Sequence, residues 1–226
     1  MNRRCNKDSF WPSYVDIMTT LFAIMVVLFA VSFSRFRANE KELRQLADKY
    51  EEIKSIYDMV EKIDPTYFEF NKEYVKHIFK IQVTFQKGCF NIDGELQDDI
   101  SNPAVADNLR KRVVEAGNEI MSTIKSLQTT AMKQDIKYLV VIEGQASADG
   151  YNVSDYYNND VLSYQRALGL HRFWKAHGID FSSMPKCELV ISGSGEGGVP
   201  RVKGDEMYNQ RFMIHIVPVI GNLRLN

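Results

Sequence analysis

The chain has 226 residues, with few cysteines, few histidines and almost no net charge. Its 28 basic residues nearly cancel its 29 acidic ones, so no overall field attracts nucleic acid. Its 3 cysteines and 4 histidines show no metal-ligand spacing. The run GSGEGG lacks the following Lys-Ser/Thr of a phosphate-binding loop. With no nucleophile-and-base pattern either, we expect no enzyme, no metal, no cofactor and no nucleic-acid partner.

One long apolar run stands near the N-terminus, SYVDIMTTLFAIMVVLFAVSF, residues 13–33. About 20 helical residues cross a hydrocarbon core of about 30 Å. We therefore predict a transmembrane helix over residues 13–34, in contact with membrane lipids and preceded by a short segment over residues 1–12. Basic residues flank both ends of the run, so the distribution of positive charge does not orient the helix.

A cleaved signal peptide is the alternative interpretation of this run, with Arg3 and Arg4 as its basic start. Three features favour a membrane helix instead. The run is longer than the usual apolar part of a signal peptide, Asp16 falls inside it, and Arg35 and Arg37 follow it as a stop-transfer flank.

Asp16 is the one charged residue between Tyr14 and Phe33. Hydrocarbon disfavours an ionised carboxylate, so an acid kept there marks a functional site by default. A carboxyl group that exchanges between its neutral and ionised forms can load and release a proton, and one charge moved through 100 mV yields about 2.3 kcal/mol. A single apolar helix cannot line a proton path, so partner helices are required. The alternative is a structural Asp16 that hydrogen-bonds a neighbouring helix.

Thr19 and Thr20 lie one helical turn beyond Asp16. Their hydroxyl groups are placed to hydrogen-bond the Asp16 carboxyl group or a partner helix, so we predict that they line the pore. The alternative is a threonine hydroxyl bonded to its own helix backbone.

A charged segment over residues 35–66 follows the membrane run and ends at Pro65, which cannot continue a helix. Its apolar residues step by three and four, as in the seam of a coiled coil: Leu43, Leu46, Tyr50, Ile53, Tyr57 and Val60. This spacing predicts either a juxtamembrane helix that pairs with a second copy or a single amphipathic helix packed on its own domain.

Residues 67–226 change to an α/β pattern. We expect helices from Pro103 and over residues 162–176, the first with an apolar face formed by Val105, Leu109, Val113, Ala116, Ile120, Ile124 and Leu127. We expect strands over residues 81–85, 138–142, 188–191 and 212–217. A β-α-β-α-β-β order predicts an α/β (α+β) domain built as a two-layer sandwich.

Four blocks in this region resemble the OmpA-like peptidoglycan-binding family: IEGQASADG, NNDVLSYQRAL, GSGEGGVP and NQRFMIHI. Glycines bracket the first block and occupy the third, and the other matching residues follow the family pattern in order: Gly144, Gly150, Asn159, Leu162, Ser163, Arg166, Ala167, Gly193, Gly195, Glu196, Asn209 and Arg211. The resemblance implies a fold that binds the cell wall.

The family grips the free carboxylates of diaminopimelate in the peptide stem, through an Asp in the turn and an Arg at the helix start. Arg166 matches that Arg, whereas Ser147 stands at the Asp position and Asp149 lies two residues further on. Either Asp149 substitutes through a shift of the loop, or Ser147 makes a weaker contact; Arg166 as an ordinary surface arginine is the alternative. The resemblance implies a peptidoglycan-binding set of Ser147, Asp149, Asn159, Leu162, Arg166 and Arg211.

The N-terminal run SYVDIMTTLFAIMVVLFAVS resembles the membrane helix of the flagellar stator B subunit family, MotB, and Asp16 falls on the ion-carrying Asp of that family. The resemblance implies a single-pass protein of the bacterial inner membrane, with the N-terminus cytoplasmic and the large domain periplasmic. It also implies a homodimer, a transported ion that is H⁺ rather than a bound cofactor, and a pentamer of MotA-like or ZorA-like multi-span A subunits around two B helices.

The runs LSYQRALGLHRFW, CELVISGSGEGGV and NQRFMIHIVP, with the short and weakly basic N-terminus, are similar to B subunits of Zorya antiphage defence motors. A flagellar or other motor, and a passive cell-wall anchor of the OmpA family, are the alternatives.

In a periplasmic domain, Cys89 and Cys187 either form a disulfide or remain free thiols, while Cys5 lies on the other side of the membrane.

Overall fold

The computed structural model describes residues 11–130 and 136–220, and the chain divides into two compact units between residues 52 and 53. Each unit is described by itself. Cys5 and residues 1–10 of the predicted N-terminal segment lie outside the described residues.

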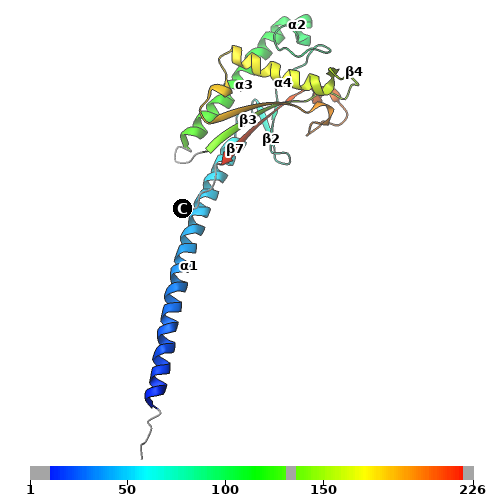
Figure 1. Cartoon of the computed structure of the whole chain (residues 1–226). Coiled ribbons are helices and arrows are strands. Elements are labelled where there is room, and N and C mark those ends of the chain that lie inside the picture. The colour runs from blue at the N-terminus through cyan, green and yellow to red at the C-terminus, as the bar shows by residue number, and fades with distance from the viewer. Residues whose placement is uncertain (1–10, 131–135, 221–226) are drawn as a thin grey trace, which may run out of the picture. The chain divides into compact units, whose positions relative to one another are not determined.

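Helix α1 (Trp11–Glu61) covers both the predicted membrane segment and the predicted juxtamembrane segment (Figure 1). No glycine or proline interrupts it after Pro12, and it ends before Pro65. It contains one stretch long and apolar enough to cross a membrane, with a mean hydropathy of 2.3 and none of that stretch buried in the protein. The predicted apolar N-terminal helix is therefore present.

The juxtamembrane seam divides into two parts with different surroundings. Leu43, Leu46 and Tyr50 are exposed. Val60, in the last turn of the same helix, is buried in the core of the second unit. The end of the seam thus packs on its own domain, whereas its beginning has a free apolar face.

The second unit contains a five-stranded sheet that is covered by helices. The strands of this sheet lie in the order β1-β2-β7-β3-β6. Strand β3 pairs in parallel with β6 and antiparallel with β7. Helices α3 and α4 pack on the sheet, as Figure 1 shows. The bounds are β1 Phe68–Asn71, β2 Lys76–Phe79, α2 Gln97–Ser101, α3 Pro103–Thr130, β3 Ile136–Gly144, α4 Asn159–Ala176, β6 Cys187–Gly193 and β7 Phe212–Ile220. The predicted two-layer α/β sandwich is confirmed.

The core lies between the helices and the sheet. On α3, the predicted apolar face is fully buried from Val113 to Leu127, but Val105 is exposed and Ala106 takes the buried position in the first turn. Trp174 of α4 closes the layer by donating its indole N–H to the Val113 carbonyl at 2.7 Å.

The predicted strand over residues 81–85 is wrong, and a hairpin of β1 and β2 precedes it in the sheet instead. Ile81, Val83 and Phe85 are buried, so the alternation that predicted a strand does report burial. However, the segment has only one isolated bridge, between Phe85 and Leu96, and joins no strand of the sheet. Alternation gives the buried face of a segment, but it does not supply a hydrogen-bonding neighbour.

The two cysteines of the second unit are free thiols. Burial raises the pKa of Cys187 to about 11, so this thiol stays protonated at neutral pH. Of the two alternatives drawn from the sequence, unpaired cysteines are what the structure contains.

Glu143, at the end of β3, is the centre of a buried charge cluster and is 6% exposed. Its Oε2 accepts hydrogen bonds from Lys76 Nζ and His215 Nε2, each at 2.8 Å. Burial alone raises the pKa of this carboxyl group, but the hydrogen bonds from His215 and Lys76 outweigh burial and lower it to about 2. The charged form is therefore part of the folded structure.

We expect Glu143→Gln to destabilise the second unit by about 3 kcal/mol, because it leaves the partly buried Lys76 ammonium without its counter-charge. The wild-type contribution of Glu143 is present above its ordinary pKa of 4.5 and is lost as the pH falls toward about 2. Denaturant unfolding of the full chain in detergent, against pH, measures both effects. The matched control is Glu188→Gln at an exposed position of β6; equal stability of the two variants would contradict this account.

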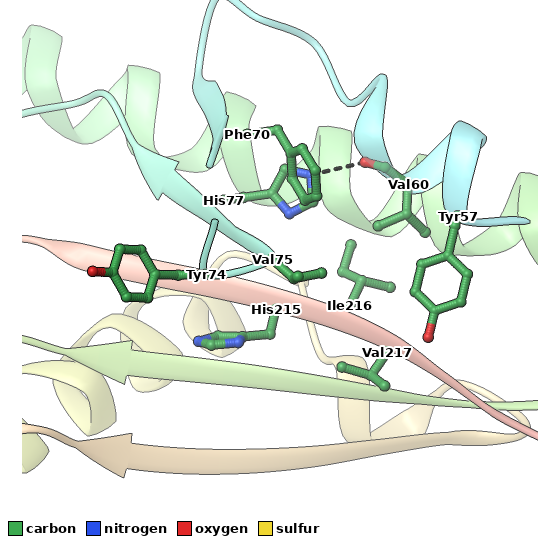
Figure 2. A pocket seen from close by; sticks show the side chains of 9 residues that line it. All are labelled: Tyr57, Val60, Phe70, Tyr74, Val75, His77, His215, Ile216 and Val217. Atoms are coloured by element: carbon green, nitrogen blue, oxygen red, sulfur yellow. Dashed lines mark hydrogen bonds between the residues drawn. The ribbon is translucent and has the colours of Figure 1, made fainter. Parts of the chain in front are cut away.

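The last turns of α1 are fixed to the sheet by His77 of β2, which is 2% exposed. Its Nε2 lies 2.8 Å from the Val60 carbonyl, as Figure 2 shows, and because a carbonyl only accepts, this nitrogen carries the proton. A cavity of about 240 Å³ lies beside this contact, lined among others by Tyr57, Phe70 and His215.

Burial lowers the pKa of His77, so the folded state favours the neutral ring. A base with a lowered folded pKa gives full stability above its ordinary value of 6.5, and that stability declines as the pH falls below 6.5. We expect His77→Gln, which keeps an N–H for Val60 but cannot ionise, to flatten this decline. Unfolding of both proteins between pH 7.5 and 5 checks it, and identical pH profiles would show that the pKa of His77 is the same in the folded and unfolded states.

Candidate functional site

The site is built where α4 begins on the ends of β3 and β6. Asn158 caps α4 by accepting the Val161 N–H at 2.9 Å. A Cβ atom on Gly144 would collide with the Ser163 carbonyl, and one on Gly193 would collide with the Tyr164 backbone. Gly144 and Gly193 are therefore required so that the first turns of α4 can lie directly on the ends of the two strands.

Asn159 joins three of the four sequence blocks through one amide group. Its Nδ2 donates to the Ser147 carbonyl at 3.0 Å, to Glu196 Oε1 at 2.7 Å and, at 3.3 Å, to Asp149 Oδ1. The side chain is 3% exposed. Asn159 thus fixes the turn that carries Ser147 and Asp149 to the start of α4.

Asp149 supplies the carboxylate of this site, and Ser147 supports it. Ser147 Oγ donates to Asp149 Oδ2 at 2.9 Å and accepts from Gln210 Nε2 at 3.0 Å, which brings in the fourth block. Burial opposes ionisation of Asp149, but hydrogen bonds from Asn159 and Ser147 outweigh it and lower the pKa. Of the two alternatives drawn from the sequence, the geometry favours Asp149 as the acidic group.

Arg166 is 4% exposed, so it is not an ordinary surface arginine. Its Nε donates to the Cys89 carbonyl at 3.3 Å, and its guanidinium carbon lies 4.8 Å from the centre of the Phe85 ring. Burial lowers the pKa of Arg166 to about 10, and the charge of Asp149 opposes that shift. The guanidinium group therefore remains charged at neutral pH.

No carboxylate within residues 11–130 and 136–220 forms an ion pair with Arg166. A buried charge without a counter-charge is costly, and a guanidinium group binds a carboxylate through two parallel hydrogen bonds. A bound carboxylate would supply the missing partner, while the Asp149 carboxylate favours a cationic group nearby. The arrangement suits a ligand that carries an ammonium and a carboxylate close together.

The loop over residues 86–95 holds Cys89 against Arg166. Glu95 Oε2 accepts the N–H groups of Phe90 and Asn91 at 2.9 and 2.8 Å, and Gly169 of α4 lets the Phe90 carbonyl approach closely. The sequence analysis did not place this loop or Phe85 in the site. The contacts of Arg166 with the Cys89 carbonyl and the Phe85 ring correspond to no sequence motif. An arginine on the predicted helix with no acidic residue three or four positions away was the available signal.

Leu162 and Arg211, two other residues of the predicted set, have different surroundings. Leu162 is buried at 5% exposure. Arg211 donates to the Pro200 carbonyl at 2.7 Å and to Gln145 Oε1 at 3.4 Å, which fixes the loop before β7. Roles of Leu162 and Arg211 in ligand binding stay predictions.

On α1, both threonines near Asp16 bond to their own helix. Thr19 Oγ1 lies 2.9 Å from the Asp16 carbonyl, and Thr20 Oγ1 lies 2.8 Å from the same atom. This is the backbone alternative for both hydroxyl groups in the single chain. A pore-lining role for Thr19 and Thr20 stays a prediction.

Comparisons with known proteins give no family assignment. No family model and no curated protein matches the sequence. Among solved structures, a MotB-like protein from Desulfovibrio vulgaris is 12% identical, with 77% of this chain and 98% of that chain covered and a TM-score of 0.38. The periplasmic domain of Helicobacter pylori MotB is 12% identical, with 66% and 87% covered and a TM-score of 0.39.

The cell wall anchor of the type VI secretion system from Pseudomonas aeruginosa is 14% identical, with 73% of this chain and 94% of that chain covered and a TM-score of 0.36. All three TM-scores lie below 0.5, so these likenesses decide nothing about function. The function has to be inferred from this chain's own residues.

Proposed function

We propose that the chain is the B subunit of an ion-driven rotary motor of the bacterial inner membrane, anchored to peptidoglycan through its second unit. The observation that carries the proposal is Asp16, the one charged residue between Tyr14 and Phe33 on an exposed apolar helix. Placing a carboxyl group in hydrocarbon costs free energy, and an inert membrane anchor gains nothing in return. We therefore infer that the acid at this position carries charge across the membrane.

The Arg166 site supports the anchoring half of the proposal. The free end of diaminopimelate carries an ammonium and a carboxylate on one carbon, which are the groups that Asp149 and Arg166 favour. A motor that turns one subunit against another needs one of them held still, and a bond to the cell wall does this. The second unit is then periplasmic and the N-terminus cytoplasmic.

The partners follow from the same proposal. A multi-span MotA-like or ZorA-like subunit supplies the helices that line the path of the ion, five copies around two B helices, with H⁺ as the ion. The exposed side chains of Leu43, Leu46 and Tyr50 provide the face through which two B chains pair. The resemblance of α4 and β7 to Zorya B subunits favours antiphage defence over a flagellar stator, with ion flow signalling envelope disturbance through the A subunit to effectors.

We expect Asp16→Asn to reduce ion flux to the level of empty membranes, because the amide keeps the shape of the carboxyl group but cannot carry a proton. Flux is measured in vesicles that contain the full chain and a multi-span A subunit that co-purifies with it, and phage protection in cells is the second readout. Asp48→Asn, exposed on the same helix, is the control. Full flux with Asp16→Asn would remove proton transfer by Asp16 from this proposal.

We expect Arg166→Ala to lower affinity for purified sacculi about 100-fold, since it removes both hydrogen bonds to a ligand carboxylate. Arg166→Lys keeps the charge without the planar fork and should fall between the two proteins. Arg172→Ala, at an exposed position of the same helix, is the control. Sacculus pull-down with the full chain gives the affinities, melting curves confirm folding, and unchanged retention of Arg166→Ala would remove Arg166 from ligand binding.

A further inference from the structure

A small hairpin lies in the sequence between Asp149 and Asn159, two residues of the Arg166 site, and is not part of the five-stranded sheet. It consists of β4 (Asn152–Ser154) and β5 (Tyr157–Asn158), which pair only with each other. Three apolar side chains project from it: Val153, Tyr156 and Tyr157 are 73%, 81% and 64% exposed. So much apolar surface on seven consecutive residues marks an interaction site.

The hairpin is held firmly against the start of α4. Asn158 uses its Oδ1 to cap the helix and its Nδ2 to donate to the carbonyls of Ser154 and Asp155, at 3.2 and 3.0 Å. One amide group therefore ties the hairpin and the helix end together. The backbone that carries Tyr156 and Tyr157 is thereby held beside the site without a ligand.

Tyr151, which directly precedes the hairpin, connects it to the residues of the Arg166 site. Tyr151 donates its backbone N–H to Asp149 Oδ1 at 3.2 Å, and its hydroxyl would lie 3.1 Å from a Cβ atom on Gly88, next to the Cys89 carbonyl that holds Arg166. A tyrosine thus bridges the turn and the loop over residues 86–95. The aromatic surface begins at the ligand groups and continues onto the hairpin.

We propose that the Tyr156–Tyr157 hairpin binds the glycan strand of peptidoglycan while Arg166 and Asp149 bind its peptide stem. This inference rests on the proposed anchoring function. Sugar rings present C–H faces that pack on aromatic rings and hydroxyl groups that bond to tyrosine O–H, so both halves of a tyrosine are used. In peptidoglycan the stem is attached to the sugar, and a stem held at Arg166 brings its sugar to the adjacent surface.

The charges of the hairpin favour a glycan over a lipid surface. Residues 152–158 contain one acid, Asp155, and no basic residue, whereas binding to an anionic membrane relies on lysine and arginine. Exposed aromatic rings with so little charge fit a hydroxyl-rich ligand. A protein partner is distinguished from a glycan by the experiment.

The test compares two probes on the full chain in detergent by titration calorimetry. One is the stem tripeptide that ends in diaminopimelate, and the other is the same peptide attached to its GlcNAc–MurNAc disaccharide. The wild type should bind the disaccharide probe about 10-fold more tightly. Tyr156→Ala with Tyr157→Ala should abolish this gain and leave tripeptide affinity unchanged, while Tyr208→Ala, an exposed tyrosine elsewhere, should keep it.

Asn158→Asp provides a second variant, because it keeps the oxygen that caps α4 and loses the N–H groups that hold the hairpin. It should reduce the disaccharide gain, which is measured as the ratio of its own affinities for the two probes. A wild type that binds the tripeptide without any gain from the disaccharide overturns this inference alone. A wild type that binds neither probe overturns the anchoring function as well. A double tyrosine variant that keeps the disaccharide gain but loses phage protection assigns the hairpin to a protein partner and overturns the glycan proposal.

Discussion

The close packing of α4 on the ends of β3 and β6 is the constraint on which the rest of the second unit depends. Gly144 and Gly193 permit it, because any Cβ atom at these positions would collide with the α4 backbone. Once the helix lies there, the Asn159 amide reaches the turn of Ser147 and Asp149, and Arg166 follows on the same helix. The candidate site, to which four separate sequence blocks contribute, thus depends on two positions that have no Cβ atom.

Two buried charges of this unit have opposite surroundings. Glu143 is matched by Lys76 and His215 inside the fold, and its charge therefore serves stability. Arg166 is equally buried, but a backbone carbonyl and a phenylalanine ring are its neighbours, and no described carboxylate forms an ion pair with it. Arg166, which no described carboxylate pairs, suits a ligand carboxylate, whereas the paired Glu143 serves stability.

In the proposed function, a carboxylate in an apolar helix and a guanidinium group in a domain bound to the cell wall make physical sense on one chain. Charge moved through Asp16 produces work only if some part of the assembly resists the motion. The proposed attachment of the second unit to a rigid polymer would provide this resistance, and a contact that includes the glycan as well as the stem would spread the load over more than one group. The free apolar face at Leu43, Leu46 and Tyr50 lies between these two functions along the chain.

The sequence by itself determined the apolar helix, Asp16 within it, the buried face of α3 and the identity of the blocks around Asn159 and Arg166, because periodicity, hydropathy and glycine spacing are local properties. It misplaced the first strand, since alternation at residues 81–85 reports burial and not a hydrogen-bonding neighbour. Only the tertiary structure showed that Ser147 hydrogen-bonds the Asp149 carboxylate, placed Cys89 and Phe85 against Arg166, and showed that Val60 packs in its own domain. These depend on contacts between residues far apart in the chain, which no local pattern encodes.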